Sequence, residues 1–137
     1  MQPTKLTRVP LYAIVLDREH EVLIGNIALL ENALALGRGA DAVPGILKEL
    51  SEDGVFRFAG EDRLMRRIRY PGRDRHTRQH HSLRSRLQQL TEMTRNGEIL
   101  VALQLLNFMR EWLSGHVAIS DMQLGAFLHA REVNTRG

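Results

Sequence analysis

The chain has 137 residues, 43% of them apolar, and a formal net charge of +3. This size predicts one domain over residues 1–137, and the apolar content excludes a disordered chain. The absence of cysteine excludes a disulfide scaffold, a thiolate zinc site and a cysteine nucleophile.

Helical blocks separated by helix breakers make up the chain. Aromatic content is 5%, and no segment alternates between apolar and polar residues over six positions, so no strand is predicted. The predicted helices run from about Asp17 to Gly37, from after Asp41 to before Pro71, from near Asp74 to Asn96-Gly97, from Glu98 to about Gly115, and from Ser120 to Arg131. Because short connections make successive helices antiparallel, we expect an all-α, up-down-up-down antiparallel four-helix bundle with a short C-terminal helix.

Six ionisable residues interrupt the apolar seams of these helices. They are His20, Arg57, Glu61, His76, His80 and His116. Burying such groups costs several kcal/mol each unless they are paired or bind a metal. In an antiparallel bundle the starts of the first and third helices and the ends of the second and fourth share one pole. All six residues are therefore predicted to meet in one layer.

The spacing within this layer is typical of a metal site. His76 and His80 are four residues apart, so they lie one turn apart on the same helix face. Asp121 follows His116 by five residues, out of phase with the fourth helix but in phase with Leu124. We therefore expect a break near residues 116–120 that turns Asp121 inward. Imidazoles and carboxylates without a thiol suit iron, zinc or manganese.

Four motifs follow one another along residues 12–128. They are Leu16-Asp17-Arg18-Glu19-His20-Glu21, Glu61-Asp62-Arg63-Leu64-Met65, Tyr70-Pro71 with His76-xxx-His80, and Trp112-Leu113-xx-His116-Val117-xxx-Asp121. In order and placement they resemble the hemerythrin family, and more narrowly the bacteriohemerythrins. The resemblance implies a bacterial non-haem di-iron protein that binds dioxygen reversibly and is not an enzyme.

The resemblance also implies a role for each site residue. His76, His80 and His116 would serve one iron and His20 the second, with Glu61 and Asp121 as bridges. Dioxygen would bind at the second, less crowded iron.

Arg57 departs from the family pattern, which has a histidine ligand of the second iron at this position. Arginine stays protonated and has no lone pair to give. At about 5 Å from a dication, in an effective dielectric near 20, the guanidinium opposes binding by about 7 kcal/mol. We expect it to pair with Glu61, four residues along the helix.

Three functions from different classes follow. The first is a dioxygen carrier, store or sensor with an altered di-iron centre. The second is a protein with one iron or zinc, held by His76, His80, His116 and one carboxylate. The third is a metal-free interaction module in which Arg57 forms a buried ion network. The third is disfavoured, since the module would need none of the other ligands. Arg57 favours one metal, whereas His20 and the two carboxylates favour two, and the first function is the one that we favour. The protein partner and the oligomeric state are not indicated.

Other partners find little support in the sequence. Ten arginines lie between Arg57 and Arg86, but no aromatic residues alternate with them for base stacking, so we interpret them as solvated surface. No apolar run reaches the ~18 residues of a membrane span, and residues 1–10 lack a signal-peptide pattern. We expect a cytoplasmic protein that binds neither nucleic acid nor membrane.

Overall fold

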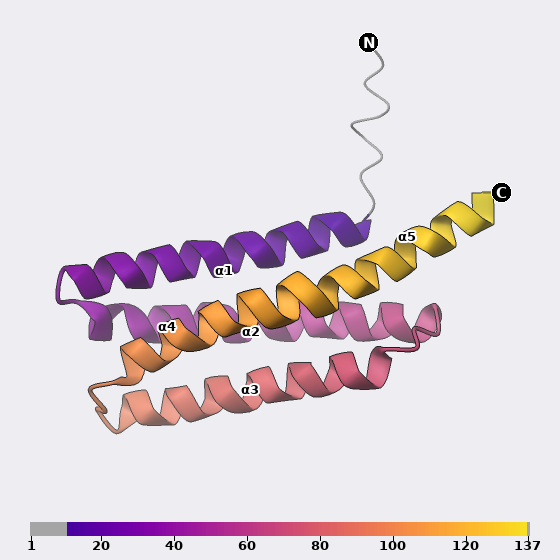
Figure 1. Ribbon diagram of the computed structural model, residues 1–137. Helices are drawn as coiled ribbons and strands as arrows, with labels where there is room; N and C mark the ends of the chain where they lie inside the picture. The colour runs from indigo at the N-terminus through magenta and orange to yellow at the C-terminus, as the bar shows by residue number, and fades with distance from the viewer. Residues whose placement is uncertain (1–10, 137) are drawn as a thin grey trace, which may run out of the picture.

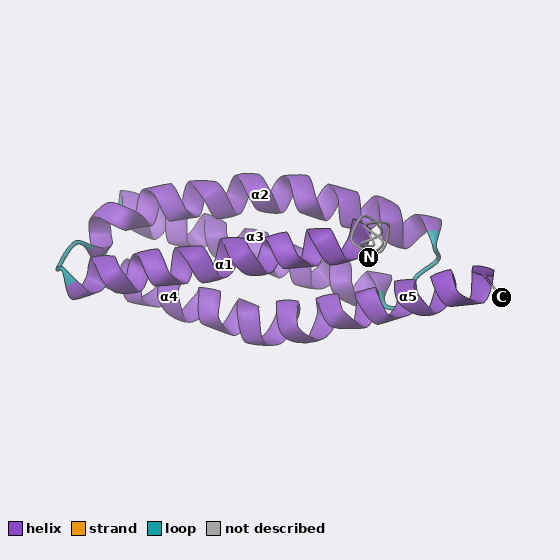
Figure 2. Cartoon of the chain, turned by 90° about the horizontal axis from the view of Figure 1, so that it is seen from above, coloured by secondary structure: helices purple, strands orange, loops and turns teal. Residues whose placement is uncertain are grey.

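The computed structural model describes the backbone of residues 11–136 and the side chains of residues 18–131. That stretch contains helices and short loops but no strand (Figure 2). The elements are α1 (Leu11–Ala35), α2 (Gly39–Arg67), α3 (Arg73–Arg95), α4 (Val101–Trp112), a π-helical segment (Leu113–Asp121) and α5 (Met122–Arg136). The predicted all-α bundle with a C-terminal helix is confirmed.

The four long helical rods lie side by side and alternate in direction (Figure 1). Both α1 and α3 pack against α2 and α4, and α2 and α4 also contact each other across the common core. The fourth rod is continuous: α4 passes through the π-helical segment into α5 without a loop. Two predicted boundaries are wrong, because α1 begins at Leu11 and not at Asp17, and α4 begins at Val101 and not at Glu98.

A residue with positive φ follows three of the helices. Gly37 and Gly97, with φ values of 73° and 70°, follow α1 and α3. This left-handed conformation favours glycine, and both positions were predicted as helix stops. After α2 the same region is occupied by Arg69, at φ 54°. There the backbone N–H of Tyr70 donates to the carbonyl of Met65 at 2.9 Å and closes the helix end.

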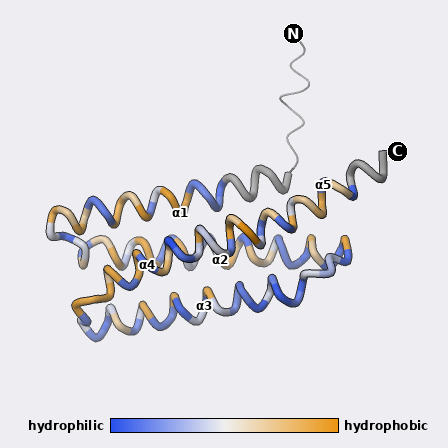
Figure 3. Tube along the Cα trace, viewed as in Figure 1, coloured by the Kyte–Doolittle hydropathy of each residue, from blue (hydrophilic) through white to orange (hydrophobic). Residues whose placement is uncertain are grey.

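Apolar and polar residues alternate along the helices (Figure 3), and buried apolar residues form the core. The larger apolar cluster fills most of the bundle and includes Leu30, Val43, Leu90 and Leu105. A smaller cluster of Met65, Leu124 and Leu128 lies between the end of α2 and the first half of α5. No helix in the described part of the chain has both the length and the apolar content needed to cross a bilayer.

Candidate metal centre

Three buried histidines from two helices meet in the core. His76 and His80 come from successive turns of α3, and His116 comes from the π-helical segment across the bundle. Their side-chain nitrogens lie within 4.8 Å of one another, and each residue is at most 5% exposed. Three imidazole nitrogens therefore face one small volume.

Two carboxylates face the same small volume as the imidazoles. The Oε2 atom of Glu61 lies 2.9 Å from Nε2 of His80 and 3.5 Å from Nε2 of His76. The Oδ1 atom of Asp121 lies 3.2 Å from Nε2 of His76 and 3.1 Å from Nε2 of His116. Each carboxylate thus contacts two imidazoles.

The π-helical segment explains how Asp121 reaches the centre. The predicted break near residues 116–120 is wrong, since the helix continues from Leu113 to Asp121. In a π-helix the repeating hydrogen bond spans five residues, one more than in an α-helix. His116 and Asp121, five residues apart, therefore fall one turn apart on the same face. The segment brings both side chains inward without a loop.

Most polar atoms of the centre are buried without a hydrogen-bond partner. They are Nε2 of His76, His80 and His116, both carboxylate oxygens of Glu61 and Asp121, and Oε2 of Glu19. An unsatisfied buried polar group costs about 1–3 kcal/mol, and more when it is charged. Nitrogen and oxygen donors that converge without thiolate suit iron, zinc or manganese. The residues present therefore fit a metal ion.

Side chains around the histidines hold the rings in place. The Nδ1 atom of His116 lies 2.7 Å from Oε1 of Gln79, so a proton on Nδ1 leaves the Nε2 lone pair free for a metal. Trp112 stacks on His116 with the ring centroids 4.1 Å apart, and Phe58 stacks on His80 at 3.7 Å. Gln79 is not among the site residues predicted from the sequence. The one sequence feature that could have indicated its contact with His116 is its position one residue before His80.

His20 does not join the centre, in contrast to the prediction. Its side chain is exposed, while its neighbour Glu19 is 5% exposed and points into the bundle. His20 lies three positions and Glu19 four positions before the buried Leu23, and both spacings are compatible with the buried face of a helix. The rotation of α1 buries Glu19. Its carboxylate lies within 4.8 Å of the donor atoms of His116 and Asp121.

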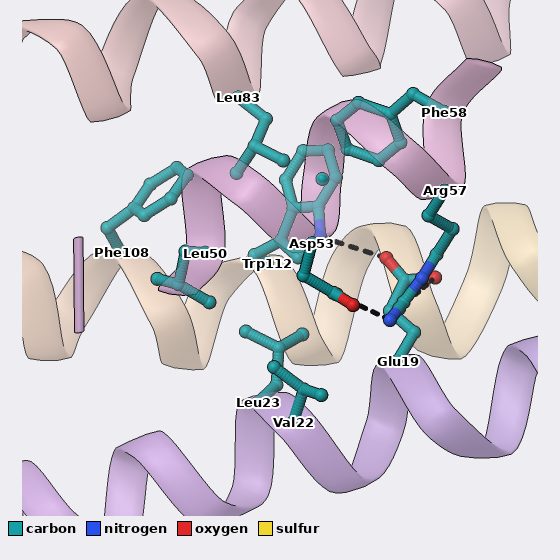
Figure 4. Close-up of a pocket in the computed structure, with 11 residues that line it drawn as sticks. Glu19, Val22, Leu23, Leu50, Asp53, Arg57, Phe58, Leu83, Phe108 and Trp112 are labelled. Atoms are coloured by element: carbon teal, nitrogen blue, oxygen red, sulfur yellow. Dashed lines mark hydrogen bonds and ion pairs between the residues drawn. The ribbon is translucent and has the colours of Figure 1, made fainter. Parts of the chain in front are cut away.

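Arg57 is buried and pairs with two carboxylates (Figure 4). Its guanidinium lies 2.5 Å from Oδ2 of Asp53, one turn earlier on α2, and 3.5 Å from Oε2 of Glu19 on α1. The predicted pair with Glu61 is therefore wrong: the side chain reaches back along α2 and leaves Glu61 to the histidines. The indole N–H of Trp112 donates to the other oxygen of Glu19 at 3.4 Å.

Mutual attraction sets the protonation of His76 and Glu61. Burial by itself lowers the pKa of His76, but the carboxylates of Asp121 and Glu61 outweigh it and raise this pKa to about 9. Burial likewise opposes ionisation of Glu61, yet His76 and His80 lower its pKa to about 2. In the metal-free chain His76 therefore carries a proton at neutral pH that a metal ion would displace.

The remaining groups shift mainly through burial. Burial lowers the pKa of His116 to about 4, with a smaller contribution from the charge of His76 and against the opposite effect of Glu19. Burial also lowers the pKa of His80. Burial and the carboxylate of Asp121 raise the pKa of Glu19 well above its usual range, against the opposite effect of Arg57. His80 and His116 are thus neutral at pH 7, with free lone pairs.

Together, the fold and this site define a four-helix bundle with a buried cation-binding centre. The sequence profile of the hemerythrin HHE cation binding domain matches residues 13–128, so the chain belongs to this family. The resemblance inferred from the motifs is confirmed. No curated protein and no solved structure matches the chain significantly.

Proposed function

We propose that this protein is a non-haem iron protein that binds dioxygen, as a carrier, store or sensor, and that it is not an enzyme. The observation that carries the proposal is the convergence of three imidazoles and two carboxylates whose inner atoms lack hydrogen-bond partners. A metal-free interaction module would have to keep three imidazoles and two carboxylates buried with only one another as partners. Metal binding relieves the cost of this burial, which disfavours the module.

Each residue has a defined task in this proposal. His76, His80 and His116 would supply nitrogen donors, and Glu61 and Asp121 would supply oxygen donors. Iron in this position would supply the redox-active atom to which dioxygen binds. Gln79 orients His116, while the stacked rings of Trp112 and Phe58 cover the imidazoles and limit the access of water.

A small cavity lies next to Glu19, Phe58 and Trp112, which contact the centre, although none of the five candidate ligands lines it. Its volume is about 20 Å³, enough for one small molecule. Most of its walls are apolar, formed by Val22, Leu23, Leu50, Phe58, Leu83, Phe108 and Trp112 (Figure 4). Glu19, Asp53 and Arg57 form the polar edge of the cavity. Dioxygen is the partner that we propose.

The test is iron loading followed by exposure to dioxygen. We expect the chain, reconstituted anaerobically with Fe(II) and desalted, to retain iron by elemental analysis. Its absorption spectrum should change on admission of air and revert on deoxygenation. His116→Ala should abolish both results, whereas His129→Ala, which alters an exposed histidine, should preserve them. Failure of the unaltered chain to retain iron, or an unchanged spectrum in air, would overturn the proposal.

A further inference from the structure

We infer that the centre holds one metal ion per chain and that the guanidinium of Arg57 takes the place of a second cation. This inference rests on the proposed metal-binding function and specifies its stoichiometry. It follows from the distribution of nitrogen donors and from the position of one buried arginine.

Within residues 18–131, all the imidazoles that face inward meet at the same place in the core. The donor atoms of His76, His80 and His116 form one group within 4.8 Å. The other three histidines, His20, His81 and His129, are exposed. His116 also forms a group with Glu19 and Asp121, and His76 with Glu61 and Asp121. When all three imidazoles bind one ion, a second ion beside it finds no further nitrogen donor among the described residues. Only the carboxylates of Glu19, Glu61 and Asp121 remain to hold it.

Arg57 already lies next to one of those carboxylates, that of Glu19. Its side chain is 5% exposed, and its guanidinium lies 3.5 Å from Glu19, whose carboxylate reaches within 4.8 Å of donor atoms of His116 and Asp121. One carboxylate thus separates the fixed positive charge from the metal group. Because arginine stays protonated even when buried, this charge cannot be removed by deprotonation.

Asp53 holds the guanidinium in this position. It contacts Arg57 at 2.5 Å from the preceding turn of α2, and its own side chain is 23% exposed. The arginine is therefore anchored on one side by Asp53 and on the other by Glu19. A dication among the carboxylates would meet the repulsion of this anchored charge in a poorly solvated interior. With Arg57 in place, the carboxylate of Glu19 already has a cationic partner.

The alternative is a buried ion pair that serves packing alone and has no effect on metal binding. Metal stoichiometry separates the two. We would reconstitute each variant anaerobically with Fe(II), remove loosely bound metal and count iron per chain by elemental analysis. The unaltered chain should retain one ion.

Arg57→His removes the fixed charge and adds a neutral nitrogen donor, so its iron content should rise towards two per chain. Arg57→Gln removes only the charge and should give an intermediate value. Arg57→Lys retains the charge and should stay at one. Arg63→His is the matched control: it places a histidine on the exposed face of the same helix and should also stay at one. Circular dichroism checks that every variant is helical.

Each outcome decides between the claims. Two ions in the unaltered chain would overturn the inference and leave the proposed function standing, whereas no retained ion would overturn the proposed function. One ion in both Arg57→His and Arg57→Gln would show that Arg57 does not control the stoichiometry. If Arg57→His fails to fold, Arg57→Gln and Arg57→Lys carry the comparison, and equal counts in these two would overturn the role of the charge.

Discussion

His80→Ala should remove most of the stabilisation that a metal ion gives to this bundle, while His81→Ala should leave it intact. His80 supplies an inward nitrogen 2.9 Å from Glu61, and its ring stacks on Phe58. His81, one residue further along α3, is exposed. The two variants delete the same side chain from adjacent positions of one helix. Only the first deletes a candidate ligand.

The size of the effect follows from linkage. An ion that binds only the folded chain adds about 4 kcal/mol to the free energy of unfolding when its free concentration is about 1,000 times the Kd. A hundredfold loss of affinity in His80→Ala removes about 2.7 kcal/mol of this. For a chain of 137 residues, each kcal/mol shifts the Tm by roughly 3–5 °C. The metal-induced rise in Tm should therefore be roughly 10 °C smaller in His80→Ala.

Thermal unfolding followed by circular dichroism, in chelator and at one fixed free Fe(II) or Zn(II) concentration, provides the measurement. The relevant quantity is the difference between the two melts of each protein. This difference cancels the packing cost of the lost ring, which acts in both conditions. Equal metal-induced shifts in His80→Ala and the unaltered chain would refute the assignment of His80. Absence of any shift in the unaltered chain would refute the metal centre.

Three further predictions follow from other contacts. Gln79→Leu should weaken metal binding about 10–100-fold in competition titrations, because His116 loses the partner that orients it, whereas Gln79→Glu should retain tight binding. The raised pKa of His76, about 9, keeps this residue protonated at pH 7, so metal binding should release about one proton per ion. The affinity for the metal should therefore rise with pH up to about 9 and then level off. An affinity that does not depend on pH would contradict this. Gly39→Ala should lower the free energy of urea unfolding by about 1–3 kcal/mol, since the added Cβ would lie 2.6 Å and 3.2 Å from side chains of α1 and α4. Gly45→Ala, where a Cβ meets nothing within 4 Å, should raise it by about 0.5–1 kcal/mol.

Local sequence information was enough to predict the bundle and most of its centre. Helix periodicity and helix stops such as Gly37 and Gly97 depend on a few neighbouring residues, so they can be read without the fold. The antiparallel order then brings helix ends to one pole. For that reason Glu61, His76, His80 and His116 could be expected in one layer, and the structure does bring them together.

Helix geometry at Asp121 could not be derived in the same way. The spacing of five between His116 and Asp121 indicated an irregular helix, and a break in the helix was the interpretation. A π-helical segment satisfies the same spacing and keeps the backbone hydrogen-bonded throughout. Which of the two forms depends on packing against the rest of the bundle, not on the residues of the segment alone.

Local patterns along the chain are enough to predict four amphipathic helices with histidines and carboxylates at one pole. They are also enough to recognise the family, because the motifs are local and follow one another in a fixed order. Packing between helices, in contrast, sets the inward position of Glu19 in place of His20 and the pairing of Arg57 with Asp53 and Glu19. The physical reason is that the rotation of a helix by one residue, and the direction of a long flexible side chain, are set by contacts between helices.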